Sequence, residues 1–243
     1  MADSVQIESS TAAGGTSGKA YKPSAGDRPF LQWPGWAHLR YFLWLAPLVL
    51  ASWVVIFGGA DWLAAQHSFR VRIHFDAELE LPFVPVFVLG YVSLNVLLVL
   101  APFVLRSRQE LQALAAALIG VTAIAGIGFV MIPAEAAYPA PTADVPGRLG
   151  WLLAVAKRAA LRHNMVPSLH VALAGVCALT YATRAGRFGG LLLSSWLALI
   201  AVSTLLIHQH HVIDVATGLA LAWAGKRFIF QRLVSRTPPF AYS

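Results

Sequence analysis

Charged side chains are scarce in this chain, because Lys, Arg, Asp and Glu make up only 12% of its 243 residues. A soluble globular domain carries about 25% charged residues. The apolar fraction is 58% and the mean hydropathy is +0.65, which is more apolar surface than a water-soluble domain of this size can bury. An ordinary cytosolic enzyme is therefore a poor fit. The single cysteine excludes an intrachain disulfide, and 19 Gly with 14 Pro exclude a collagen-like chain.

Long apolar stretches dominate the sequence instead. A helix that crosses a bilayer needs about 20 mostly apolar residues. Six stretches meet or approach that length, and we expect an all-α integral membrane bundle of six transmembrane helices. These stretches are 41–60, 82–105, 111–132, 168–184, 189–207 and 212–230.

The remaining segments set the domain organisation. Residues 1–28 are polar and rich in Ser, Ala and Gly, so we expect a disordered cytoplasmic tail. Residues 29–236 form the six-span domain, and 237–243 form a short C-terminal tail. The loop at 133–167 contains an amphipathic stretch that we expect to lie at the membrane interface. In the other long loop, we expect Asp76, Glu78 and Glu80 to form a solvated entry to the second span.

The excess of positive charge, +7 at pH 7, is explained by membrane topology. Twelve of the 18 basic residues fall in the N-terminal segment and in the turns near 106–110, 184–187 and 226–236. Because cytoplasmic loops are enriched in Lys and Arg, this bias predicts a cell (inner) membrane protein with both termini in the cytoplasm. The basic pI then gives no reason to expect nucleic acid as a partner. The other six basic residues are Arg70, Arg72, Arg148, Lys157, Arg158 and Arg162.

Two histidine-containing segments fall on the extracytoplasmic face of this topology. One carries Ser168 and His170 at the start of the fourth span, and the other carries His210 and Asp214 between the fifth and sixth spans. The start of a helix with a preceding Pro favours anion binding. The i, i+4 spacing lets Asp214 hold one nitrogen of His210, which leaves the other nitrogen to attack phosphorus.

The rest of the predicted site supplies protons and positive charge. His170 would protonate the leaving alkoxide. Basic side chains would hold the phosphoryl oxygens, and Arg148, Arg158 and Arg162 lie on the correct side, together with Lys157. For Lys157, Arg158 and Arg162, snorkelling of the side chain to lipid headgroups is an equal alternative.

These motifs resemble those of the type-2 phosphatidic acid phosphatase superfamily. Its P-S-x-H motif matches Pro167 to His170, and its third motif matches the segment from Ser203 through His210 to Asp214. The resemblance implies a six-span fold in which His210 forms a phosphohistidine, Asp214 orients it, His170 is the general acid and Ser168 binds a phosphate oxygen. Two features depart from the family pattern. Thr204 stands where the third motif has Arg, and the first motif has no clear counterpart.

The resemblance implies a membrane-embedded lipid phosphate phosphatase that needs no cofactor and no metal. The motifs look most like the branch that contains inositol phosphorylceramide synthases, so transfer of the headgroup to another lipid or alcohol is one alternative. A non-catalytic protein that binds lipid phosphates is a second. Zinc binding by His208, His210 and His211 is a third and weaker one. The expected partners are the lipid phosphate substrate and membrane lipids.

Overall fold

The computed structural model describes residues 29–139 and 145–236, and these residues form helices and no strand. The two predicted tails, 1–28 and 237–243, lie outside the described residues. The helical elements are α1 (Trp36–Ala65), η2 (Asp76–Glu80), η3 (Pro85–Phe87), α2 (Val88–Val92), α3 (Leu94–Val99), α4 (Ala101–Val104), α5 (Arg108–Met131), α6 (Gly147–Ala160), α7 (Leu169–Ala182), α8 (Gly186–Leu206), α9 (Val212–Ala224), η4 (Gly225–Phe230) and α10 (Gln231–Arg236).

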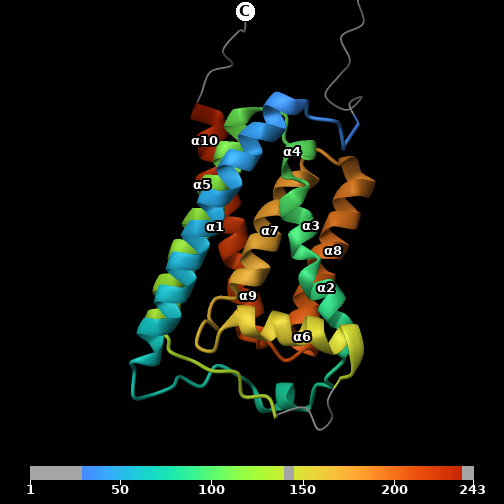
Figure 1. The fold of residues 1–243 in the computed structure, drawn as a ribbon. Coiled ribbons are helices and arrows are strands. Elements are labelled where there is room, and N and C mark those ends of the chain that lie inside the picture. The colour runs from blue at the N-terminus through green and yellow to red at the C-terminus, as the bar shows by residue number, and fades with distance from the viewer. Residues whose placement is uncertain (1–28, 140–144, 237–243) are drawn as a thin grey trace, which may run out of the picture.

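The helices form a bundle around α7, which packs against α5, α8, α9 and α3 (Figure 1). Helix α1 packs along the outside of α5. Both ends of the described chain lie at one end of the bundle, which we call the terminal end. Helix α6 lies across the opposite end, which we call the site end (Figure 1). The six apolar stretches of the sequence thus run between the two ends.

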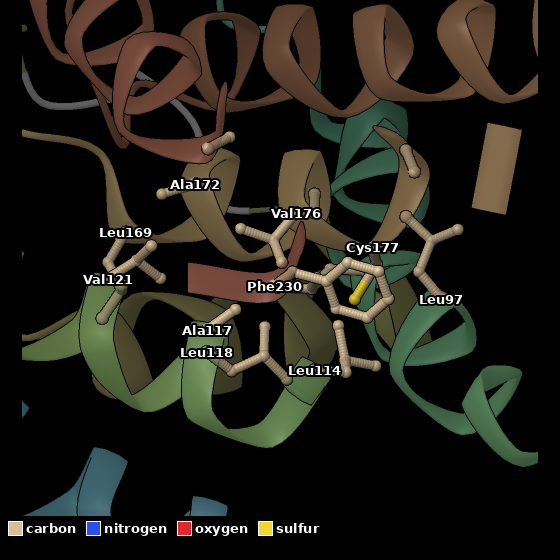
Figure 2. Packing of buried hydrophobic residues seen from close by; sticks show 14 of the residues in the cluster. Leu97, Leu114, Ala117, Leu118, Val121, Leu169, Ala172, Val176, Cys177 and Phe230 are labelled. Carbon is tan, nitrogen blue, oxygen red and sulfur yellow. The ribbon is translucent and has the colours of Figure 1, made fainter. Parts of the chain in front are cut away.

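Small side chains let the helices around α7 approach closely, and Figure 2 shows the apolar packing there. A Cβ atom added at Gly175 of α7 would lie 2.5 Å from the Cβ of Ala222 on α9. Cys177 is fully buried in the same cluster, where it packs as a small apolar residue. Near the site end, a Cβ added at Gly218 of α9 would lie 2.6 Å from the carbonyl oxygen of Ser168. Glycine at 218 therefore allows α9 to approach the N-terminus of α7.

Three of the described helices are long and apolar enough to cross a membrane: α1, α5 and α8. Helix α1 buries little of its surface and exposes large side chains such as Trp44, which is 83% exposed. Helix α7 has only 14 residues, a length of about 21 Å at 1.5 Å per residue. By length and composition, the structure thus supports three of the six expected spans.

The second apolar stretch is not one helix but the 3-10 turn η3 followed by three short α-helices, and the sequence contains reasons for the breaks. The Ser93 hydroxyl donates a hydrogen bond to the Gly90 carbonyl (2.6 Å), in competition with the backbone ladder where α2 ends. Pro102 has no N–H to donate and lies at the start of α4. Helix α5 begins more regularly, with Ser107 accepting from the Glu110 N–H and the Glu110 carboxylate accepting from the Ser107 N–H.

Candidate active site

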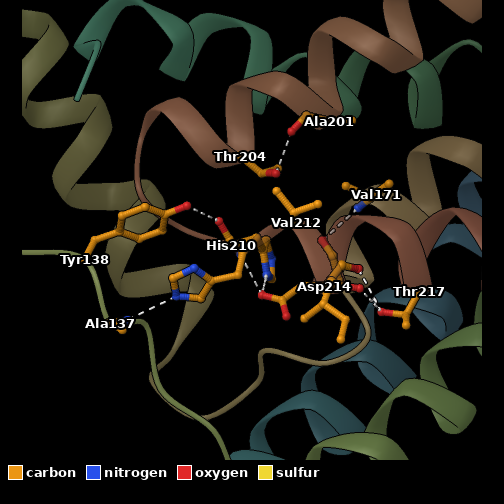
Figure 3. A network of polar contacts seen from close by, with 12 residues as sticks. Ala137, Tyr138, Val171, Ala201, Thr204, His210, Val212, Asp214 and Thr217 are labelled. Carbon is orange, nitrogen blue, oxygen red and sulfur yellow. Dashed lines mark hydrogen bonds and ion pairs between the residues drawn. The ribbon is translucent and has the colours of Figure 1, made fainter. Parts of the chain in front are cut away.

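His210 lies in the loop between α8 and α9, one residue before the N-cap of α9. Its Nδ1 is 3.3 Å from Oδ2 of Asp214, and the Asp214 side chain is fully buried (Figure 3). The same carboxylate oxygen accepts a hydrogen bond from the His211 N–H (2.8 Å). Nε2 of His210 has no hydrogen-bond partner among the described residues. The pair therefore holds Nδ1 of His210 against a carboxylate and leaves Nε2 without a partner among the described residues.

The backbone around His210 is fixed from two sides. The N–H groups of Gln209 and His210 both donate to the Thr204 carbonyl, at 2.9 and 3.2 Å. On the other side, the Tyr138 hydroxyl donates to the His210 carbonyl (3.1 Å; Figure 3). Thr204 itself is buried, and its hydroxyl donates back to Ala201 (2.7 Å). Thr204, which stands where the third motif of the resembling superfamily has Arg, therefore anchors the loop through its backbone carbonyl.

His211, the next residue, uses both ring nitrogens. Its Nε2 accepts a hydrogen bond from the Ala137 N–H (3.1 Å), so its proton is on Nδ1, which donates to Glu78 (3.1 Å). The ring also stacks on Tyr138, with centroids 4.4 Å apart. Burial lowers the pKa of His211, in keeping with a neutral ring. No nitrogen of His211 is left for attack on a substrate.

Glu78 is the acidic residue that sequence reasoning missed. The expectation of a solvated entry was wrong at this position, since Glu78 is only 5% exposed. Besides the His211 ring, its carboxylate accepts from the Val212 N–H (2.8 Å) and the Phe75 N–H (3.1 Å). A sequence separation of more than 130 residues hides this contact from any local pattern. Glu78 thus fastens the first long loop to the start of α9.

His208 is held away from His210 by different contacts. Its Nε2 lies 3.0 Å from the Leu81 carbonyl oxygen, and its ring stacks on Tyr138 with centroids 4.1 Å apart. Burial lowers its pKa. In the described part of the chain, no group of three His, Cys, Asp or Glu residues is arranged to hold a metal ion.

Ser168 is the N-cap of α7 and is fully buried. Its hydroxyl accepts from the Val171 N–H (3.3 Å), and its own N–H donates to the Asp214 carbonyl (2.9 Å). Pro167 precedes the cap and is therefore outside the helix. The next two amides, those of Leu169 and His170, have no acceptor among the described residues. A helix start of this kind favours anions.

His170 lies in the first turn of α7. Its Nε2 is 2.7 Å from the Tyr91 carbonyl oxygen, and its ring stacks on the Tyr91 ring with centroids 3.8 Å apart. A carbonyl can only accept, so Nε2 carries a proton and Nδ1 is the nitrogen left for other chemistry. His170 and His210 both line one cavity of about 400 Å³.

Asn164 also lines this cavity and was not expected from the sequence. Its Nδ2 donates to the Phe57 carbonyl (2.8 Å), which fixes the orientation of the amide. Its Oδ1 is buried and has no partner among the described residues. The side chain therefore adds an unused acceptor beside the two histidines.

The basic residues predicted for phosphate binding lie outside the cavity wall. Arg148 and Arg158 are exposed on α6, as is the neighbouring Lys157. The Arg162 side chain is 78% exposed, and its Nε is 3.4 Å from Glu135. Among the described residues, those that line the cavity include no Lys or Arg.

A second charged cluster, also missed from the sequence, joins the loops of the site end. Glu135 accepts from Arg70 (2.9 Å) and lies 3.2 Å from Nε2 of His163. The hydrogen bond from Arg70 is the main reason that the pKa of Glu135 is lowered. Asp61, near the end of α1, accepts from the backbone N–H groups of Arg162 and His163, at 3.1 and 2.7 Å. The cluster ties the end of α1 to the segment that leads into α7.

A family model described as the PAP2 superfamily matches residues 61–228, which include Ser168, His170, His210 and Asp214. The chain belongs to the PAP2 superfamily. The resemblance seen in the P-S-x-H and H-x-x-x-D motifs is therefore confirmed. No curated protein and no solved structure matches the chain significantly. Membership suggests phosphatase or related phosphotransferase activity, and the superfamily is often membrane-bound.

Proposed function

We propose that this PAP2 superfamily protein is a membrane-embedded lipid phosphate phosphatase that works through a phosphohistidine on His210. The observation that carries the proposal is the pairing of His210 with buried Asp214, which leaves only Nε2 without a partner among the described residues. His170 on the wall of the same cavity provides a second imidazole. The six-span topology and the extracytoplasmic position of the site belong to the same proposal.

In the first step, the lone pair of His210 Nε2 attacks phosphorus and the ester P–O bond breaks. Asp214 stabilises the positive charge that develops on the ring. The departing alkoxide takes a proton from Nδ1 of His170, because Nε2 is engaged with the Tyr91 carbonyl. His170 holds this second proton only while the phosphate anion lies beside it. Ser168 and the free amides at the start of α7 support the phosphoryl oxygens.

In the second step, water attacks the phosphohistidine and gives a proton back to His170. The P–N bond breaks, inorganic phosphate leaves and His210 is neutral again. Arg148, Arg158, Arg162 and Lys157 are the basic residues nearest in sequence to the α7 motif. We propose that one or more of them neutralises phosphate at the mouth of the site, since the cavity wall itself supplies no cation among the described residues.

Release of inorganic phosphate from phosphatidic acid by the purified protein in detergent tests the function. We expect His210→Ala to lose at least about 10³-fold in rate, as removal of a nucleophile does. His211→Ala is the matched control for register and should keep far more activity, although it loses its loop contacts.

Other outcomes select the alternatives. Headgroup exchange on addition of a ceramide or diacylglycerol acceptor, without phosphate release, would replace hydrolysis by phosphoryl transfer to a lipid. Binding of phosphatidic acid with neither reaction would favour a non-catalytic protein. Full activity in His210→Ala would overturn the mechanism.

A further inference from the structure

The cavity at His210 continues deep into the bundle as an apolar space. Its walls come from α1, α3, α5 and α7, and α6 covers it at the site end. The polar residues His170, His210 and Asn164 gather at the site end, and the wall toward the terminal end is formed by side chains such as Leu98, Ala101 and Leu111. Asn95 and Thr122 also line the cavity, and their side chains donate to the backbone carbonyls of Val92 and Leu118. We call this space the chain slot.

The chain slot is deeper than one leaflet of a bilayer. Along α1 its lining runs from Phe57 to Phe42. These fifteen residue steps correspond to about 22 Å at 1.5 Å per residue. The Asn164 amide donates to the Phe57 carbonyl, which places this end beside the histidines. The Tyr41 hydroxyl contacts Gln112 (2.5 Å) in the first turns of α5, which places the other end near the terminal end. Half of a hydrocarbon core is only about 15 Å.

Helix α1 forms one wall of the slot and is held in place at both of its ends. At the terminal end, His38 Nε2 donates to the Leu105 carbonyl (2.9 Å), and at the site end Asp61 accepts from the backbone N–H of His163 (2.7 Å). Between these fastenings α1 packs mainly on α5, and its contacts with α3 are few.

We infer that the chain slot holds the hydrocarbon chain of the lipid phosphate, and that its depth makes the protein selective for long chains over short ones. The inference rests on the proposed function, because the phosphate must lie at His210 for the chain to follow the slot. Measured from the alkyl phosphate that is free in water, each methylene that enters the slot gains about 0.8 kcal/mol, a factor of about four in binding. Long chains therefore bind better until the slot is full.

A pair of α1 variants tests this selectivity. Ala46 lines the slot eleven residues from Phe57, about 16 Å from the polar end, whereas Ala51 is exposed on the outer face of the same helix. Trp at position 46 shortens the slot, and Trp at position 51 lies outside it. The measurement is the ratio of kcat/KM for octadecyl phosphate to kcat/KM for octyl phosphate.

We expect the wild-type ratio to exceed ten, Ala46→Trp to lower it at least tenfold and Ala51→Trp to leave it within twofold. Ala115→Leu, on the α5 wall, is the second blocking variant if Ala46→Trp does not fold. A wild-type ratio near one, or the same ratio in both Trp variants, would overturn the inference while leaving phosphate release intact.

Retention of octadecyl phosphate, measured by native mass spectrometry, separates this inference from the proposed function. The expected order is wild type and Ala51→Trp above Ala46→Trp, whether or not phosphate is released. If Ala46→Trp retains less octadecyl phosphate than the other two proteins but none of the three releases phosphate, the proposed function fails. The assignment of the slot to the hydrocarbon chain then still holds. Equal retention in all three proteins would show that the slot does not hold the hydrocarbon chain.

Discussion

His210 and His211 are adjacent in the chain, but the structure uses them for opposite purposes. Both nitrogens of His211 bind the outer loops, one to the Ala137 amide and one to Glu78. His210 gives only Nδ1 to Asp214, and its other nitrogen has no partner in the part of the chain that the structure describes. In the proposed mechanism the reactive imidazole is the one with an unused nitrogen, which residue type alone does not identify.

Short of replacing His210 itself, the largest expected effect comes from removing the charge beside it. In Asp214→Asn, the carbamoyl oxygen can still accept from the His211 N–H, so the cap of α9 survives. The developing imidazolium loses its carboxylate, and phosphate release should fall at least about 100-fold. Asp76→Asn is the matched control, because the Asp76 side chain is 84% exposed and contacts Arg72 at the surface. Equal rates in the two variants would show that Asp214 does not orient the nucleophile.

The motif residues were accessible from sequence because their spacing is local. Pro167 to His170 and His210 to Asp214 each fall within five residues, and one turn of chain brings them together. The apolar stretches likewise located the helices, since burial and lipid contact both demand apolar side chains. The helix break at Ser93 depends on a single hydrogen bond from the Ser93 hydroxyl to the Gly90 carbonyl, and a hydropathy pattern contains no information about such a bond.

Contacts between distant segments could not be predicted in the same way. Glu78, with Asp76 and Glu80 beside it, has the pattern of a solvated acidic turn, and only the fold brings His211 and Val212 to it. The chain slot was equally hidden, because its lining residues have the same composition as the residues that face lipid. Ala46 and Ala51 are both alanines on α1, but Ala46 lines the cavity whereas Ala51 is exposed on the outer face of the helix.

A smaller effect, on stability, is expected on the His211 side of the comparison. Glu78→Gln places an amide where a carboxylate accepts three hydrogen bonds, so at least one buried donor loses its acceptor. Such a loss costs about 1–3 kcal/mol. Thermal unfolding in detergent should show a lower Tm for Glu78→Gln than for wild type. Glu80→Gln, at an exposed position in the same turn, should leave Tm unchanged. Similar Tm shifts in both variants would mean that the buried carboxylate does not hold the loop.

The smallest expected effect is a dependence of stability on pH. Burial lowers the pKa of His211, so the folded protein keeps this ring neutral when the pH falls below the ordinary value of about 6.5. The unfolded chain takes up the proton there, which favours unfolding, and Tm should therefore fall between pH 7.5 and 5.5. In His211→Gln the fall should be smaller, but not absent, because burial also lowers the pKa of His208. A Tm that falls as steeply in His211→Gln as in wild type would show that His211 is protonated in the folded protein. The two nitrogens could not then both be committed to the loops, and the contrast with His210 would fail.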